Sequence, residues 1–155
     1  MQGKPVSTSR TEMAQLMMPN DANFAGFVHG GVLLSIADKV AYVCACRHAE
    51  SFCVTVSVDH VVFKEAIKVG ELVQFKASVN YAGNTSLEVG IKIIAEDLLT
   101  GRHRHTNSCY FTMVAVDKDG KKKKVPALML ETSDDERRHK NAEKRRELRL
   151  TNKMI

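Results

Sequence analysis

A polar, glycine-rich segment followed by an apolar run carries the residue types that hydrolysis of an acyl bond requires. Asn23 begins this segment, Gly30 and Gly31 close it, and Asp38 lies inside the apolar run. If the run is a helix that starts at Gly31, its first amide N–H groups are free to bind a developing negative charge. A carboxylate nearby can activate a water molecule as a general base. The pattern is therefore typical of the two halves of a hydrolytic site.

The spacing of Asp38 favours a chemical role for this residue. It comes two helical turns after Gly31, which places it on nearly the same helix face, about 10 Å along the axis. An aspartate exposed on a helix surface is the commoner situation. Here the neighbouring turns are apolar on both sides, and burying an unpaired carboxylate costs several kcal/mol. We therefore favour a catalytic role over a solvent-facing one.

The elements that must position these residues follow from the apolar periodicity. Helical spacing predicts a long buried helix from Gly31 to about Ala49, and the small residues Ala41, Cys44 and Ala45 keep it thin. Period-two alternation and turn residues predict strands at residues 52–63, 73–81, 87–93 and 105–116. Residues 11–18 alternate poorly but are apolar enough for a short strand that Pro19 ends. One long helix with a run of antiparallel strands indicates an α+β fold in which a single curved sheet wraps the helix.

The C-terminal part of the chain differs from the rest in charge. The chain has 155 residues and a net charge of +5, but residues 118–155 carry +6 and residues 1–117 carry −1. We predict a globular domain over residues 1–118 and a basic extension over 119–155. Ser133 and Glu136 have the spacing of a capping box, and the helix that they would start runs to about Leu148. That helix is charged nearly all round, so we expect it to be peripheral or partly disordered.

Cysteine usage and hydropathy indicate the setting of the protein. The four cysteines form no C-x-x-C pair, and Cys44 and Cys46 would point about 200° apart on a helix, which favours reduced core thiols. The N-terminus has no apolar leader, and Asp38-Lys39 ends the most apolar run. We expect a cytoplasmic protein without a membrane span or a membrane partner.

The segment from Asn23 to Asp38, of pattern N-x-x-G-x-x-H-G-G-x-x-L-x-x-x-D, resembles the hotdog-fold acyl-CoA thioesterases, especially the bacterial and mammalian acyl-CoA hydrolases with a basic C-terminal extension. Further matches follow in order at Pro19-Asn20-Asp21, Val54-Thr55-Val56, Val69-Gly70-Glu71 and Asn84-Thr85-Ser86-Leu87-Glu88-Val89. The resemblance implies a hydrolase of acyl-CoA in which a central helix is wrapped by a curved antiparallel sheet. It also implies a homodimer with active sites at the seam, and assembly into a homohexamer as a trimer of dimers.

The same resemblance implies roles for individual residues. Asp38 would be the general base for water, or the nucleophile that forms an anhydride, and Asn23 would orient the water or the thioester carbonyl near Asp38 of the partner subunit. Gly30 and Gly31 would let the carbonyl approach the helix end, where the Gly31 amide serves as the oxyanion hole. The residues expected to contact acyl-CoA or coenzyme A are His29, Thr55, Lys64, Asn84, Thr85 and Ser86. No metal or cofactor is expected.

Two other functions compete with this hypothesis. A hotdog-fold dehydratase of acyl thioesters pairs a catalytic histidine with a carboxylate, and His29 is the residue that could serve. A nucleic-acid-binding module would use the basic extension, but the charge of residues 1–117 and the lack of aromatic clusters in the extension argue against nucleic acid as a partner. His103 and His105 share a strand face, yet two ligands make a zinc site improbable. We expect Arg102 to His105 to face phosphate or solvent.

Overall fold

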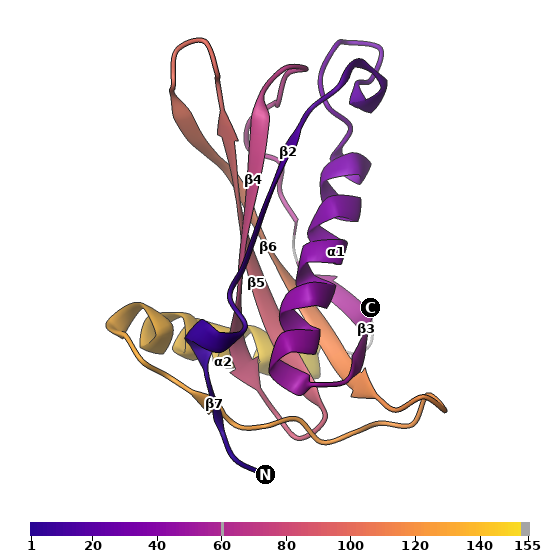
Figure 1. The fold of residues 1–155 in the computed structure, drawn as a ribbon, viewed down its shortest axis with the longest axis vertical. Helices are drawn as coiled ribbons and strands as arrows, with labels where there is room; N and C mark the ends of the chain where they lie inside the picture. The colour runs from indigo at the N-terminus through magenta and orange to yellow at the C-terminus, as the bar shows by residue number, and fades with distance from the viewer. Residues whose placement is uncertain (60, 153–155) are drawn as a thin grey trace.

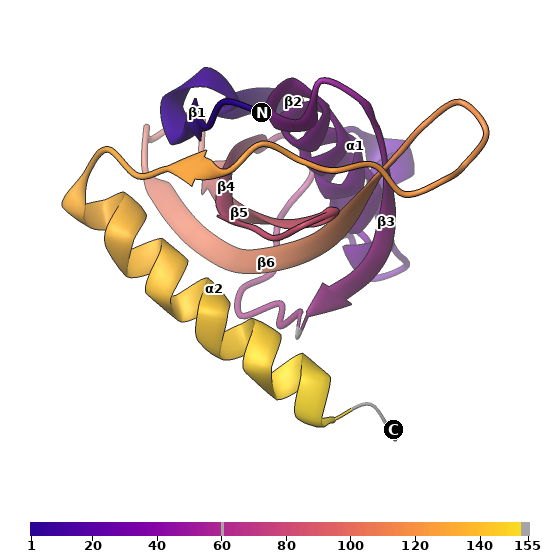
Figure 2. The same ribbon diagram turned by 90° about the horizontal axis from the view of Figure 1, so that it is seen from below.

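A computed structural model describes residues 1–59 and 61–152. The long helix α1 (Gly30–Ala49) lies against the inner face of a curved five-stranded antiparallel sheet, as Figure 1 shows. A second helix, α2 (Ser133–Thr151), lies on the outer face of that sheet (Figure 2). The strands are β1 (Lys4–Pro5), β2 (Thr11–Leu16), β3 (Phe52–Asp59), β4 (Leu72–Ala82), β5 (Ser86–Glu96), β6 (His103–Val116) and β7 (Leu128–Met129). The predicted α+β fold is confirmed.

The order of strands in the sheet is β2-β4-β5-β6-β3, which makes β2 and β3 its edges within one chain. Short 3-10 helices lie at Val6–Thr8 and Pro19–Asp21. Strand β3 ends at Asp59, whereas the prediction extended it to Phe63; Val61 to Phe63 lie outside the strand. Its pairing with β6 shifts register between Thr55 and Ser57, which is the signature of a β-bulge.

The core forms between α1 and the inner face of the sheet. Ala37, Ala41, Cys44 and Ala45 on the helix are fully buried, so small side chains bring the helix close to the strands, as predicted. The sheet contributes the alternate residues of its three central strands, Phe75 on β4 among them. This close packing fixes the direction of α1, and with it the place of the helix N-terminus.

The outward-facing row of β3 is apolar and exposed in the single chain. Phe52, Val54, Val56 and Val58 are 59%, 46%, 55% and 39% exposed. An apolar row on an edge strand is a surface that a further chain can cover. The single chain therefore leaves this apolar edge of the sheet uncovered.

Helix α2 is docked on the outer face of the sheet, which agrees with the expectation of a peripheral helix but not with that of a partly disordered one. Ala142 is fully buried against the sheet, although most other side chains of α2 are exposed. The helix also begins one residue earlier than predicted. Thr132 is the N-cap and Asp135 completes the capping box, in place of Ser133 and Glu136.

The four cysteines are free, and Cys44, Cys53 and Cys109 are buried. Burial raises the pKa of each of these three thiols to about 12. The prediction of core thiols is thus confirmed for these three, whereas Cys46 is only partly buried. Within residues 1–59 and 61–152, no helix has the length and apolar character needed to cross a membrane.

Candidate active site

The N-terminus of α1 presents free backbone donors. His29 is the N-cap, and its carbonyl oxygen accepts from Val32 N at 3.1 Å and from Leu33 N at 3.4 Å. The N–H groups of Gly30 and Gly31 precede the first intrahelical bonds and have no backbone acceptor in the described part of the chain. These donors and the helix dipole make this end of α1 suitable for an oxyanion.

The two glycines differ in what surrounds them. A Cβ at Gly31 would meet nothing within 4 Å, so the space in front of its amide is open. A Cβ at Gly30 would lie 2.9 Å from the ring of Phe63. The glycine at position 30 therefore permits an aromatic side chain to cover the helix end, a contact that the sequence pattern did not reveal.

Asp38 lies on α1 and accepts a hydrogen bond from Thr55 on β3. Thr55 Oγ1 donates to Asp38 Oδ1 at 2.6 Å. Both residues are exposed in the single chain, so the carboxylate faces open space instead of the apolar surroundings inferred from the sequence. One oxygen of the carboxylate is held by Thr55, and none of the described residues donates a hydrogen bond to the other, which leaves it available to water. The sequence pattern places Thr55 only among the residues expected to contact the substrate and does not predict this direct bond.

Asn23 lies in the loop that precedes α1, and its side-chain carbonyl is used to shape that loop. Asn23 Oδ1 accepts from Ala25 N at 2.9 Å and from Phe27 N at 3.2 Å. Only the amide NH₂ group remains available to a ligand, so Asn23 can donate a hydrogen bond but not accept one there. Among the described residues no hydrogen bond joins Asn23 and Asp38.

The predicted coenzyme A contacts do not converge within one chain. Lys64 is exposed in the segment between β3 and β4, whose backbone joins the loop before α1 through a bond from Val28 N to Ile67 O at 2.8 Å. Asn84 to Ser86 form the β4–β5 hairpin beside the start of β3, near the C-terminal end of α1, since Ala115 N donates to Thr85 O at 2.9 Å. The 20 residues of α1 span about 30 Å. The two groups therefore lie at opposite ends of the helix (Figure 1).

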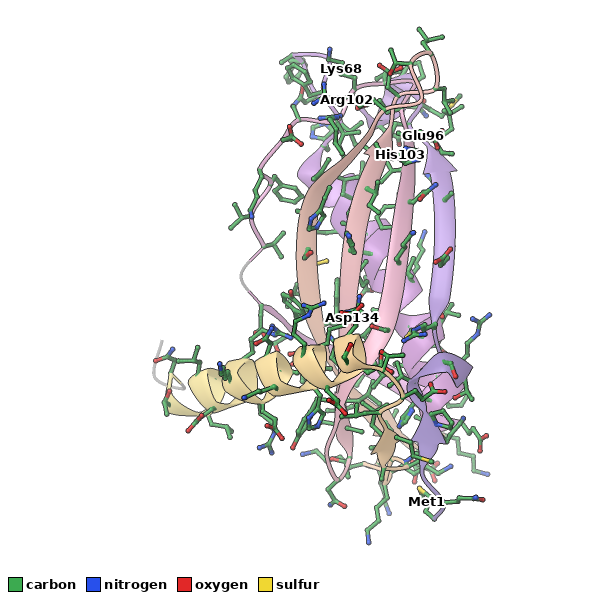
Figure 3. The ribbon with its side chains drawn as sticks, turned by 90° about the vertical axis from the view of Figure 1, so that its left-hand side faces the viewer. Met1, Lys68, Glu96, Arg102, His103 and Asp134 are labelled. Carbon is green, nitrogen blue, oxygen red and sulfur yellow. The ribbon has the colours of Figure 1, made fainter. Side chains whose placement is uncertain are left out.

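Arg104 corrects the expectation that residues 102–105 face phosphate or solvent. It donates to both carboxylate oxygens of Glu71 at 2.7 Å, and the Glu71 side chain is 10% exposed. His103 lies 3.6 Å from Glu96, whereas His105 contacts Ser108 at 2.9 Å, so the two histidines have different partners. Figure 3 shows Arg102, His103, Glu96 and Lys68 at one end of the sheet, far from Asp134 at the start of α2.

Ion pairs attach α2 to the outer face of the sheet. Arg145 donates to both carboxylate oxygens of Glu88, at 2.7 and 3.1 Å, and Arg149 pairs with Asp59 and with Glu88. The sequence analysis missed these contacts. Glu88 and Arg145 lie 57 residues apart, so no local spacing could have indicated them.

A cavity of about 740 Å³ lies between α2 and the outer face of the sheet. Lys76, Lys92 and Arg138 are among its lining residues, but Gly31 and Asp38 are not. The chemistry-bearing residues are instead on α1 and on β3, at the surface of the single chain. This cavity is thus separate from the candidate site.

The comparisons with known proteins agree with this fold and site. Residues 25–101 match the Thioesterase superfamily. A solved hexameric acyl-CoA thioesterase, in its apo form, superposes with a TM-score of 0.96 at 37% identity, over 100% of this chain and 99% of that chain. The chain belongs to the Thioesterase superfamily. Within it, the chain is a hotdog-fold acyl-CoA thioesterase.

Two further proteins are similar over most of their length. Protein VdlD of Helicobacter pylori is 52% identical over 137 residues, which are 88% of this chain and 78% of that protein. The acyl-CoA hydrolase of Staphylococcus aureus, solved with butyryl coenzyme A, coenzyme A and coenzyme A disulfide, has a TM-score of 0.91 at 33% identity, over 97% and 92% of the two chains. Its variants with alanine in place of one Asp, one Asn and one Thr have also been solved. None of these relatives favours the dehydratase or the nucleic-acid alternative.

Proposed function

We propose that the chain hydrolyses acyl-CoA with Asp38 as the general base. The carboxylate removes a proton from a water molecule, and the water oxygen attacks the thioester carbonyl carbon. The N–H of Gly31, assisted by the end of α1, binds the oxyanion. The tetrahedral intermediate then breaks its C–S bond, and coenzyme A leaves as a thiolate that takes up the proton. Because a thiolate is a good leaving group, the site requires no strong general acid.

The hydrogen bond from Thr55 to Asp38 is the observation that carries this proposal. It fixes one carboxylate oxygen at 2.6 Å and leaves the other for water. In the Staphylococcus aureus enzyme, the Asn, Asp and Thr replaced by alanine are separated by intervals of 15 and 17 residues. Asn23, Asp38 and Thr55 have the same two intervals in this chain. This agreement supports all three as members of one site.

The wider site is proposed to form between subunits. Gly31 and Asp38 lie on one helix, whereas Asn23 and the hairpin of Asn84, Thr85 and Ser86 lie beyond its two ends. We infer that Asn23 donates its amide N–H to the water or to the carbonyl beside Asp38 of the partner subunit. Lys64 and the hairpin residues would contact coenzyme A, and His29 would position the helix entry. The exposed row of β3 and the hexameric relative support assembly into a homodimer and further into a hexamer.

We also propose how the chain is divided into domains and where the protein is located. We assign residues 1–118 to the thioesterase domain and residues 119–155 to a basic extension. We place the protein in the cytoplasm, by its similarity to mammalian cytosolic acyl coenzyme A thioester hydrolases, such as that of Mus musculus at 33% identity. The chain spans only 35% of that mouse protein, so this likeness concerns one domain of it.

Release of coenzyme A thiol from acyl-CoA tests the mechanism. Loss of a general base lowers turnover by about 10²–10⁴-fold, so Asp38→Ala and Asp38→Asn should show kcat reduced by that range with the fold retained. Thr55→Val should reduce kcat less, and Thr55→Ser should retain most of it. Near-full turnover by a folded Asp38→Ala enzyme would rule the mechanism out.

Mixing of subunits tests whether the site is shared. When Asn23→Ala and Asp38→Ala chains are unfolded together and reassembled, each mixed dimer has one site with both native residues. Random pairing should then restore about a quarter of wild-type activity. Mixtures no more active than the two parent variants would place Asn23 and Asp38 in the same subunit's site.

A further inference from the structure

The last turns of α2 contact the end of β3 through Arg149. Its guanidinium donates to a carboxylate oxygen of Asp59 and lies 3.5 Å from Glu88 Oε2. The Glu88 side chain is 1% exposed and is fixed by the two bonds from Arg145. Arg149 is therefore held between carboxylates on two strands. Because its own side chain is only 23% exposed, its position is constrained more than that of a surface arginine.

Asp59 is the last residue of β3, and the chain beyond it leads to the proposed active site. Residues 61–66 form no helix or strand, although Val61 packs against the core. Phe63 comes four positions after Asp59, and its ring lies where a Cβ on Gly30 would approach to 2.9 Å. The ring thus covers one side of the helix end that presents the oxyanion donors.

We propose that Arg149 is a positioning residue for the active site, and that Phe63 forms a wall of the thioester pocket. By holding Asp59, Arg149 fixes the point from which the chain runs to Phe63. The ring covers the helix end on the side of Gly30 and so limits the approach of water to the oxyanion donors from that side, where an oxyanion hydrogen bond shielded from water is stronger. This inference rests on the proposed function and adds the basic extension to it.

The chain offers matched variants for the test. Arg149→Ala removes the ion pair with Asp59, and Arg149→Lys keeps the positive charge but not the planar guanidinium group. Lys144→Ala removes an equal charge from an exposed position of the same helix, where the described residues provide no ion pair. Phe63→Ala removes the wall. Each is assayed for thiol release from butyryl-CoA, with circular dichroism and oligomeric state as controls for folding.

Small displacements of positioning groups have large effects on turnover, so kcat of Arg149→Ala should fall by about fivefold or more, with KM changed by less than about twofold. Arg149→Lys should recover part of that loss, and Lys144→Ala should match the wild type. Phe63→Ala should reduce kcat similarly. The double variant Arg149→Ala/Phe63→Ala should be no slower than Phe63→Ala alone, because both changes act through the same ring.

Two results would overturn the proposal. One is a double variant whose loss equals the product of the single losses. The other is a folded Arg149→Ala enzyme that melts earlier but keeps the kcat of Lys144→Ala, which would make the contact structural only. If Arg149→Ala does not fold, Asp59→Asn replaces it in the test and is judged by the same criteria. Asparagine is nearly isosteric with aspartate, but it lacks the charge that Arg149 binds. Turnover that survives Asp38→Ala refutes the proposed function, whereas an Asp38-dependent enzyme indifferent to Arg149 refutes only this positioning role.

Discussion

The ion pair between Glu88 and Arg145 should be a major source of stability for the docked helix, and Arg145→Ala is the sharpest test. The Glu88 side chain is 1% exposed and that of Arg145 is 22% exposed. Burial lowers the pKa of Arg145, but the hydrogen bond and charge of Glu88 more than offset this and raise the pKa. The Arg145 guanidinium therefore stays charged at all working pH values. Removal of Arg145 leaves a carboxylate buried beneath α2.

The size of the loss follows from the contacts that disappear. Breaking a buried ion pair by removing one partner costs about 3–5 kcal/mol. Arg149 remains 3.5 Å from Glu88 and compensates in part. The guanidinium of Arg145 also lies 3.6 Å from the centre of the Tyr110 ring, a contact that contributes about 1 kcal/mol. We expect a net loss of about 3 kcal/mol, or about 6–12 °C in Tm for a chain of this length.

Urea unfolding followed by circular dichroism, at one fixed protein concentration, measures this loss. Lys144→Ala is the matched control and should change stability by less than about 0.5 kcal/mol. Glu88→Gln should lose less than Arg145→Ala, because the partly exposed guanidinium can still reach water. Replacement of both partners by Glu88→Leu and Arg145→Met should recover most of the loss. An Arg145→Ala protein as stable as the Lys144→Ala control would refute this account of how α2 is held.

Three further predictions concern single sites on α1. Gly31→Ala should fold normally, since its methyl group meets no atom within 4 Å. It should nevertheless lower kcat for acyl-CoA, because the methyl group stands in the open space before the oxyanion donor. An unchanged kcat would show that Gly31 is not part of the site. Cys46 is the one cysteine of the four that is not buried, whereas burial raises the pKa of Cys44 to about 12. Mass spectrometry after treatment with iodoacetamide at pH 8 should therefore show alkylation of Cys46 well before that of Cys44. Equal labelling of the two thiols would contradict the assignment of Cys44 as buried. His48 is fully buried, its Nε2–H donates to Pro126 O at 2.8 Å, and burial lowers its pKa below the ordinary 6.5. The unfolded chain therefore takes up a proton first as pH falls, and wild-type stability should decline below about pH 6.5 relative to His48→Gln, which keeps the donor; parallel stability curves for the two proteins would contradict this.

The sequence analysis was accurate where the information is local. The apolar spacing of α1 predicts its length to within a residue, and alternation locates strands β3 to β6 of the main sheet. Strand β2 alternates poorly and is predicted from its apolar character alone. It was inaccurate where two neighbouring residues are equally suited to a role, as with Thr132 and Ser133 at the start of α2. It could not place α2 at all, because the helix is held by Ala142 and by ion pairs to distant strands, and these contacts leave no periodic pattern.

The same distinction separates the parts of the candidate site. Gly31 and Asp38 are close in sequence and share a helix, so their relation could be derived from helical geometry. The bond from Thr55 depends on how β3 packs beside α1, and the position of Phe63 depends on a segment without regular structure. The relative position of Gly31 and Asp38 is determined within one helix, whereas the positions of Thr55 and Phe63 depend on how separate segments pack against that helix.

The position of the proposed site beside the sheet edge fits the proposal that it forms between two subunits. Asp38 and Thr55 are exposed beside β3, the edge strand whose outward row is apolar and uncovered. A second chain that covers this edge would also restrict water around the carboxylate, which makes the base and the oxyanion donors more effective. Dimerisation at this edge would thus complete the site and bury the apolar row at the same time. A substitution that weakens the β3 edge should therefore lower catalysis even where it touches no catalytic group.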